Sequence, residues 1–440
     1  MRGELSRRLG LVDTVGVVAG TIIGAGIFLT PSLVARQLPS PGWILGVWAF
    51  SGLLSLVGAL VYAELGAMIP ATGGQYVFLR ECFGPGAAFL SGWASFLVIL
   101  PGAVAWLAAA FADYLSHFLP LGPWSSKLAG IALLVVLTAA NYRGVRVGAT
   151  VQNLFAALKL AGLLALIVAA FLGPAPAVAQ TSPVTSGFSP TAFGAAMVAC
   201  LLTYDGWVSL SFVAGEVRRP QRNLPLGLAL GLSVCVVAYL LANVAYLRVL
   251  GPAGMAEATR VGAKAADRTL GHAGGVLVTA TILASIVGCA NGWFLTGPRV
   301  SFAQAQDGLF FHRLAAIHPR FRTPSVSILA LGAWSALLVA LGAYEALGSY
   351  VMLAAWLFYG LTAAGLVRLR RREPDRPRPY RMWGGIAAAL VFAAVAFGFV
   401  LNTLYTSPAP SLASLLLITA GLPAYHFWRR RKAREQWTSS

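Results

Sequence analysis

Long apolar runs recur along the chain from residue 12 almost to its C-terminal end. A helix needs about 20 apolar residues to cross the ~30 Å hydrocarbon core of a bilayer, and these runs approach or exceed that length. Glycine, proline and charged residues separate one run from the next. The pattern predicts twelve transmembrane helices, over residues 12–36, 42–69, 86–116, 125–142, 148–173, 190–215, 224–250, 273–305, 325–343, 347–368, 383–404 and 409–428. The fold class predicted is an all-α polytopic membrane protein, with one transmembrane domain over residues 1–440.

The composition agrees with this pattern, because 58% of the 440 residues are hydrophobic and only 10% are charged. Soluble globular proteins lie far from these values. A net charge of +18 could suggest a nucleic-acid partner, but such binding needs cations gathered on one soluble surface. Here the cations lie in short loops, so no nucleic-acid partner is expected. The first apolar run has no small-residue cleavage site after it and is expected to stay in the membrane.

Basic residues fall mostly on one side of the predicted membrane. One side holds 24 of the 32 lysines and arginines, in the segment before the first span, the even-numbered loops and the tail. The other side holds about six. Loops rich in these residues stay in the cytoplasm, so both termini are predicted to be cytoplasmic, at the cell inner (plasma) membrane. The clusters Arg368–Arg372 and Arg429–Arg434 are interpreted as topology anchors that also attract the headgroups of membrane lipids.

Neither the cysteines nor the histidines predict a reactive centre. The cysteines fall in a cytoplasmic loop or within spans, without CxxC spacing, and are interpreted as packing residues: Cys82, Cys200, Cys235 and Cys289. The five histidines lie at span ends or in loops and do not cluster. A membrane-embedded enzyme would need a constellation of histidine, serine or acidic residues at one interface. The sequence therefore predicts no enzyme, no metal site and no cofactor.

The glycines of the first span support two interpretations. Gly16, Gly20 and Gly24 are spaced by four, which lets two transmembrane helices pack closely. Gly26, however, adds a small residue off that stripe, in the segment Gly24-Ala25-Gly26 at the middle of the span. Unwound backbone at that depth is tolerated only where it lines a cavity. A break there would aim free N–H groups and a positive helix end at an anion such as a carboxylate.

The sixth span contains a second anomaly, because Asp205 lies near its middle. A charge at that depth costs several kcal/mol unless it is paired or hydrated, and the adjacent Gly206 offers the flexibility for another break. The first and sixth spans also begin two successive five-helix groups, 12–173 and 190–368, with two more helices over 383–428. Inverted-repeat transporters place their broken helices at these positions, so position along the chain predicts that architecture.

Lys159 is another charge within a span, roughly 16 Å from the start of its helix at ~1.5 Å per residue. This is too deep for the ammonium to reach the surface fully. The lysine could reach a water-filled crevice without a specific role, replace a coupling metal ion, or bind and release a proton. Glu64 and Arg299 lie toward the cytoplasmic ends of their spans, where they could pair in an inner gate or simply be solvated.

These features lie within longer stretches that resemble the amino acid–polyamine–organocation superfamily and, within it, the L-type amino acid transporter family in its prokaryotic form. The resemblance covers most of the chain, in the motifs GTIIGAGIFLTP at 20–31, YAELGAMIPATGGQYVFLRECFGP at 62–85, NLFAALKLAGLLALI at 153–167, TYDGWVSLSFVAGEVRRPQRNLP at 203–225, NGWFLTGPRVSFAQAQDGLFF at 291–311 and HPRFRTPSVS at 318–327. Several separated motifs in the right order are far more specific than a lone GAG.

The resemblance implies the LeuT-type fold, in which two inverted five-helix repeats have spans one and six unwound around the substrate. In such proteins backbone amides of the first break bind the amino acid's carboxylate, and backbone carbonyls beside both breaks bind its ammonium. The positions that match this substrate site are Ile22, Gly24, Ala25 and Gly26 in the first span, and Leu202, Thr203 and Asp205 in the sixth.

The resemblance also assigns roles to charged and aromatic side chains. The family's fifth-span lysine corresponds to Lys159, whose charge is thought to occupy the place of a sodium ion in sodium-coupled relatives, which implies sodium-independent transport. Phe28, Tyr204 and Trp207 are candidates for aromatic covers or gates near the site, or are packing residues like most aromatics on membrane helices.

Two departures from relatives bear on partner and substrate. Eukaryotic members that pair with a heavy subunit carry a cysteine in the loop after span three, and HFLPLGPWSSK at 117–127 has none. No disulfide-linked heavy chain is therefore expected. Many relatives have a small residue where this chain has Asp205, whose carboxylate could favour cationic substrates or neutralise Lys159.

The residues and the resemblance together predict a secondary transporter that binds an amino acid at the membrane midplane and rocks spans one, two, six and seven against a scaffold. Its sodium independence is what the resemblance implies. The resemblance favours exchange (antiport) of neutral, and with Asp205 also cationic, L-amino acids. Proton-coupled symport is the alternative, and a transporter-like amino acid sensor is a more distant one. A channel is not favoured, because no repeated filter segment or ring of charges occurs.

Overall fold

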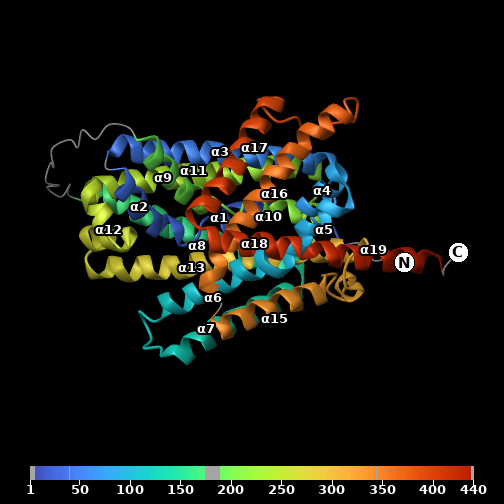
Figure 1. Cartoon of the computed structure of the whole chain (residues 1–440). Coiled ribbons are helices and arrows are strands. Elements are labelled where there is room, and N and C mark those ends of the chain that lie inside the picture. Colours follow the sequence, from blue (N-terminus) through green and yellow to red (C-terminus); the bar gives the residue numbers. More distant parts are fainter. Residues whose placement is uncertain (1–4, 39, 174–188, 343, 438–440) are drawn as a thin grey trace.

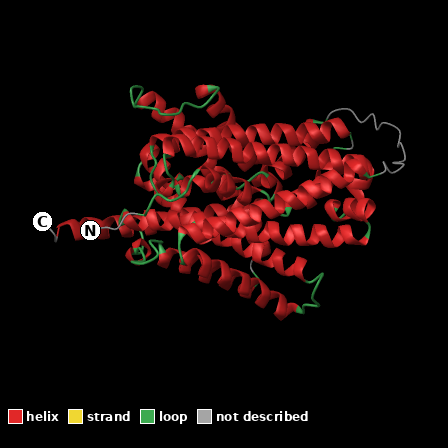
Figure 2. Ribbon diagram, turned by 180° about the vertical axis from the view of Figure 1, so that it is seen from behind, coloured by secondary structure: helices red, strands yellow, loops and turns green. Residues whose placement is uncertain are grey.

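The computed structural model describes residues 5–38, 40–173, 189–342 and 344–437, and no strand occurs within those ranges. Most of the long helices run side by side along one direction, joined by short loops (Figures 1 and 2). A bilayer core has no water to bond the backbone, and a helix satisfies its own N–H and C=O groups. The predicted helical class is confirmed.

The first half of the chain begins with two short helices and continues with longer ones. Their bounds are α1 (Leu11–Ile22), α2 (Gly26–Gln37), α3 (Pro41–Met68), α4 (Gln75–Phe83), α5 (Pro85–Ala94), α6 (Leu100–Leu115), α7 (Pro123–Tyr142) and α8 (Val145–Leu172). A π-helical turn, η1 (Ser95–Ile99), connects α5 to α6, so that these elements form one span of 31 residues.

The second half also starts with a short helix that soon ends. Its elements are α9 (Pro190–Thr203), α10 (Ser209–Phe212), η2 (Ala214–Glu216), α11 (Pro220–Glu257), α12 (Val261–Leu270), α13 (His272–Thr296), α14 (Pro298–Gln306), η3 (His312–Ala315), α15 (Ser325–Leu341), α16 (Tyr344–Arg372), α17 (Gly385–Thr406), α18 (Pro408–Thr419) and α19 (Gly421–Trp437).

Within the described ranges, nine helices are long and apolar enough to cross a membrane, and the bent pair α1–α2 makes a tenth. The segments predicted as spans six and nine contain the shorter apolar helices α9 and α15. α15 ends at Leu341 because Gly342 follows it with φ 70°, a left-handed conformation that stops a helix.

Two features depart from the predicted boundaries. α11 continues past residue 250 to Glu257, across a kink at Gly251 (φ 65°) that Pro252 follows. Two helices, α4 and α12, lie outside the predicted spans, because each is too short and too polar to cross a bilayer.

α1 lies at the centre of the bundle, in contact with α8, α11 and α13. A Cβ added to Gly16 would stand 2.0 Å from Asn153 Oδ1 of α8, and one added to Gly20 would stand 2.3 Å from Gln152 Nε2. A Cβ on Gly24 would meet nothing closer than 3.9 Å. The first two glycines thus form a packing stripe, whereas Gly24 belongs to the break, so each interpretation of the glycines applies to part of the span.

Candidate functional site

The first span is broken where Gly24-Ala25-Gly26 predicts a break. α1 ends at Ile22 and α2 begins at Gly26, with an angle of 47° between the two helices. Ile23 closes α1 by donating its N–H to the Ala19 carbonyl at 3.0 Å, and its own backbone is extended (φ −71°, ψ 95°). The first N–H groups of a helix have no acceptor within it, so the start of α2 presents amides and a positive helix end at this point.

The sixth span is broken beside Asp205, as the sequence predicts. α9 ends at Thr203 and α10 begins at Ser209, with turns between them. Gly206 lies in this break with φ 118°, and a Cβ there would stand 3.0 Å from the Thr21 carbonyl oxygen of α1. Only glycine adopts that conformation at low cost, so it lets the backbone of the second break approach the end of α1.

Lys159 of α8 lies against the end of α1 and is fully buried. Its ammonium donates hydrogen bonds to the carbonyls of Gly20 at 2.7 Å, Ile23 at 2.6 Å and Ser285 at 3.1 Å. A cation is favourable there because the C-terminal end of a helix carries partial negative charge. These contacts do not fit a lysine that extends into a water-filled crevice.

Tyr239 of α11 connects the two breaks, and sequence reasoning missed it. Its buried hydroxyl lies 3.1 Å from the carbonyl oxygen of Ile22, at the end of α1, and 3.4 Å from that of Thr203, at the end of α9. One hydroxyl thus brings the two broken spans to the same point. No pattern along α11 distinguishes this tyrosine from Tyr246, seven residues further on.

Asp205 points toward α16. Its Oδ1 accepts a hydrogen bond from the Tyr359 hydroxyl at 3.0 Å. Among the described residues no ion pair joins Asp205 to Lys159, whose hydrogen bonds go to backbone carbonyls. These contacts do not support direct pairing of the two charges as the role of the carboxylate.

The remaining predicted residues of the sixth span contact their own helix and α2. The Thr203 hydroxyl lies 2.8 Å from Thr30 Oγ1 of α2 and 2.9 Å from the Ala199 carbonyl. A Cβ added to Gly26 would stand 2.8 Å from Thr203 Cγ2, so the start of α2 fits closely against the end of α9. The Leu202 carbonyl accepts a long backbone hydrogen bond from Asp205 N–H at 3.4 Å.

The three predicted aromatic gates have different neighbours. Phe28 is buried beside α12, where a Cβ on Gly262 would stand 2.7 Å from its ring. Tyr204 packs between side chains of α3 and α11, with ring centroids 5.8 Å from Trp48 and 5.0 Å from Tyr239. Trp207 packs among side chains of α3, α16 and α17. Its ring centroid lies within 6.1 Å of those of Tyr62, Tyr359 and Phe392. The structure therefore does not bring the three rings together.

The expectation that Glu64 and Arg299 pair with each other or are solvated is wrong, because both are buried and have other partners. Arg299 Nε donates to Glu216 Oε1 at 2.8 Å, and Nη2 donates to Oε2 at 3.2 Å. Glu64 accepts two hydrogen bonds from Arg370 at 2.8 and 2.5 Å and one from the Met382 N–H at 2.8 Å. Each pairing joins helices far apart in sequence, which a sequence pattern does not reveal.

Glu216 is also bound through its backbone. Its carbonyl accepts N–H groups from Arg8 at 2.8 Å and Leu9 at 3.0 Å, and the Arg218 N–H donates to the Leu9 carbonyl at 2.8 Å. A short parallel bridge thus joins the segment before α1 to the segment after the second break. Glu216 ties both segments to α14, which carries Arg299.

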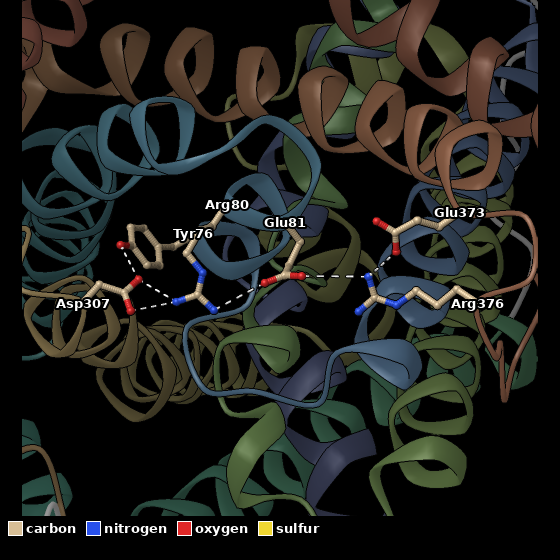
Figure 3. A network of polar contacts seen from close by, with 6 residues as sticks. All are labelled: Tyr76, Arg80, Glu81, Asp307, Glu373 and Arg376. Carbon is tan, nitrogen blue, oxygen red and sulfur yellow. Dashed lines mark hydrogen bonds and ion pairs between the residues drawn. The ribbon is translucent and has the colours of Figure 1, made fainter.

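Figure 3 shows a second polar network, which extends from α4 to the loops after α14 and α16. Arg80 Nη1 of α4 lies 2.8 and 2.6 Å from the carboxylate oxygens of Asp307. Burial lowers the pKa of Arg80, but the hydrogen bonds and charge of Asp307, together with Tyr76 and Glu81, outweigh it, so the pKa is raised overall. Arg376 Nη1 lies 3.0 Å from Glu373 and 3.9 Å from Glu81 of α4. The network therefore joins the C-terminal half of α4 to both loops.

A helical membrane protein whose two interrupted spans meet beside buried charges has the architecture of a solute carrier. The sequence model of the family described as "Amino acid permease" matches residues 9–422. The chain therefore belongs to the amino acid permeases of the amino acid–polyamine–organocation superfamily, and its relatives are L-type transporters. It is a multi-pass membrane transporter of amino acids and not an enzyme.

Three relatives illustrate the range of this family. The b(0,+)-type amino acid transporter 1 of Rattus norvegicus is 33% identical, over 98% of this chain and 90% of the relative. The serine/threonine exchanger SteT of Bacillus subtilis (strain 168) is 31% identical, over 98% of both chains. The cystine/glutamate transporter of Homo sapiens is 30% identical, over 99% of this chain and 87% of the relative.

Proposed function

We propose that this protein is a sodium-independent exchanger of L-amino acids with the LeuT-type fold. In this proposal the chain has twelve spans, of which 12–173 and 190–368 are inverted five-helix repeats and 383–428 are two further helices. Both termini lie in the cytoplasm, on the side favoured by the basic loops. The observation that carries the proposal is the Tyr239 hydroxyl within reach of the Ile22 and Thr203 carbonyls, since it means that two broken helices end at one point.

The substrate's backbone groups would bind at the first break. Amides of the segment Gly24-Ala25-Gly26 lie at the positive end of α2 and suit a carboxylate. Carbonyls at the ends of α1 and α9 suit an ammonium group. The proposed substrate-binding residues are Ile22, Gly24, Ala25, Gly26, Leu202, Thr203 and Asp205.

Sodium independence is supported by the contacts of Lys159. Carbonyls freed by an unwound helix are the usual ligands of a coupling sodium ion in this kind of carrier. Here a protein ammonium bonds three carbonyls, two of them at the end of α1. A sodium ion would have to compete with a fixed charge of the same sign, so transport should proceed without it.

Substrate preference is proposed to include neutral and cationic amino acids. Asp205 lies in the second break with one carboxylate oxygen on Tyr359, which leaves its other oxygen for a cationic side chain. The surroundings are otherwise largely apolar and suit a neutral side chain, with Trp207 at 5.4 Å between ring centroids from Tyr359.

Alternating access would rock the bundle α1–α3 and α9–α11 against the remaining spans, called the scaffold below. Closure at the cytoplasmic end would use the buried pair Glu216–Arg299, which joins these two parts. We assign Phe28 as a cover beside α12 and Trp207 as a cover beside α16, and Tyr204 as a packing residue of the bundle. No disulfide-linked heavy chain is proposed, because the loop at 117–127 has no cysteine.

The test uses purified protein in proteoliposomes without sodium, either empty or preloaded with unlabelled amino acids. Uptake of a panel of labelled amino acids should occur only into preloaded vesicles. Uptake into empty vesicles that grows with an inward proton gradient would replace exchange by proton-coupled symport. Binding without any flux would indicate an amino acid sensor instead.

A further inference from the structure

A chain of buried side-chain amides crosses the scaffold near the first break. Asn141 of α7 donates through Nδ2 to Asn291 Oδ1 of α13 at 2.9 Å. Asn291 in turn donates through Nδ2 to Gln152 Oε1 of α8 at 2.9 Å. All three side chains are at most 1% exposed. Buried amides without partners are costly, so such a chain requires a specific arrangement.

Backbone carbonyls at its start fix the direction of this chain. Asn141 Nδ2 also donates to the Leu137 carbonyl at 2.9 Å, which sets which atom of that amide is nitrogen. Asn291 Nδ2 donates to the Gly148 carbonyl at 3.0 Å, which sets the second amide. Because Gln152 then accepts from Asn291, its amide nitrogen is one free end of this series of amides, and Asn141 Oδ1, also buried without a partner among the described residues, is the other.

The Gln152 end faces α1. Gln152 Nε2 is buried and has no hydrogen-bond partner among the described residues. A Cβ added to Gly292 of α13 would stand 3.0 Å from Gln152 Nε2 and 2.2 Å from Thr21 Oγ1 of α1, so both polar atoms lie beside the same glycine. Thr21 Oγ1 donates its own hydrogen to the Val17 carbonyl at 2.6 Å, which leaves its lone pairs as acceptors.

We infer that Gln152 is a positioning residue, which donates to the Thr21 hydroxyl oxygen once α1 moves and then holds α1 against the scaffold. In this structure, where the Glu216–Arg299 pair is formed, its amide nitrogen has no partner among the described residues. Lys159 lies seven residues further along α8, on the same helical face. The scaffold would thus hold α1 at two levels, by the Lys159 ammonium at the break in this structure and by the Gln152 amide, two turns away, after α1 has moved. This inference rests on the proposed alternating access, since the contact must form when α1 moves.

Two glycines, Gly20 and Gly292, leave the space that this contact needs. Gln152 Nε2 lies between α1 and α13, where a Cβ on Gly20 would stand only 2.3 Å from it. Larger residues at Gly20 or Gly292 would occupy the space of the amide and the hydroxyl. The small residues between α1, α8 and α13 therefore allow a polar contact as well as close packing.

The experiment is a double-mutant cycle between Gln152→Met and Thr21→Val, measured as exchange in proteoliposomes. Methionine and valine keep approximate size and shape while removing the donor and the acceptor. Each single variant should lower the maximal exchange rate about fivefold, the effect of one lost hydrogen bond, with KM within about twofold. The double variant should be no slower than either single variant, because both remove one contact.

Two further variants separate positioning from general packing. Thr21→Ser keeps the hydroxyl and should restore the wild-type rate, whereas Leu158→Met, on an exposed side of α8, should leave the rate unchanged. If Gln152→Met fails to fold, the pair Thr21→Val and Thr21→Ser still decides, since equal rates for these two would overturn the inference. Additive effects in the cycle would overturn it as well.

The exchange rate of the wild-type protein tests the proposed function separately from the role of Gln152. Wild-type exchange together with an additive cycle would overturn only the role of Gln152. Absence of wild-type flux would overturn the proposed function, and the role of Gln152 with it.

Discussion

The two broken spans differ in how their freed backbone is held. At the first break, four carbonyls have donors from other helices. Lys159 bonds Gly20 and Ile23, Tyr239 bonds Ile22, and the Cys289 thiol bonds Thr21. At the second break, the main outside contact is made by a side chain, the Asp205 carboxylate on Tyr359.

This difference suggests a division of labour under the proposed function. The first break is fixed by backbone contacts and would bind the groups common to all amino acids. The second break is fixed through a carboxylate and would meet the part of the substrate that varies. Substitutions at the first break should therefore act on every substrate, whereas changes at Asp205 should act selectively.

The largest effect is expected for Lys159→Ala. Removing the ammonium leaves two carbonyls of α1 and one of α13 without their donor, each costing about 1–3 kcal/mol, so exchange should fall about a hundredfold for every substrate while the protein stays folded. Initial rates in proteoliposomes and size-exclusion profiles would measure this. Leu158→Ala, on an exposed side of the same helix, is the matched control. Wild-type uptake in Lys159→Ala would refute the role of the lysine.

The next effect is expected for Gly206→Ala. The residue has φ 118° and its new Cβ would stand 3.0 Å from the Thr21 carbonyl oxygen, so strain of about 1–3 kcal/mol should lower the melting temperature and slow exchange about thirtyfold. Gly194→Ala of α9 is the control, because no atom lies within 4 Å of its added Cβ. Similar behaviour of the two variants would show that the close approach of the breaks is unimportant.

A smaller effect is expected for Tyr239→Phe, which removes the hydroxyl shared by the Ile22 and Thr203 carbonyls. Exchange should slow about tenfold for all substrates, with little loss of thermal stability. Tyr246→Phe is a close control on the same helix, since its buried hydroxyl has no partner among the described residues. Equal rates for the two variants would mean that Tyr239 does not hold the breaks together.

The smallest and most selective effect is expected for Asp205→Asn. The amide still accepts the Tyr359 hydrogen bond but loses the negative charge, so KM for cationic amino acids should rise about fivefold while that for neutral ones changes little. Competition uptake with labelled arginine and leucine, repeated across pH, would measure the ratio. A variant that matches the parent in both preference and pH dependence would return Asp205 to a structural role.

Much of the fold could be predicted from the sequence, because transmembrane helices follow from length and apolarity alone. The two breaks were also predictable, since Gly24-Ala25-Gly26 and Asp205-Gly206 place small or charged residues at mid-depth. α12 was not, because ten residues with the sequence VGAKAADRTL give no spanning signal.

The partners of the site residues were much harder to predict. Glu216 and Arg299 are 83 residues apart, and only the folded bundle brings them together. Tyr239 and Tyr246 have equivalent surroundings along the chain, and only the position of the α1 carbonyls distinguishes them. Sequence patterns thus located the breaks and two of the side chains that hold them, Lys159 and Asp205, but not Tyr239 or the partners of any of them.

The backbone bridge between Leu9 and Val217 has a practical consequence for studying this carrier. Because the segment before α1 is hydrogen-bonded to the segment after the second break, it should move with the substrate site. Arg7 is exposed and lies two residues from that bridge. An environment-sensitive dye attached at this position would therefore report events at the membrane centre to the solution, without any label in the transport path.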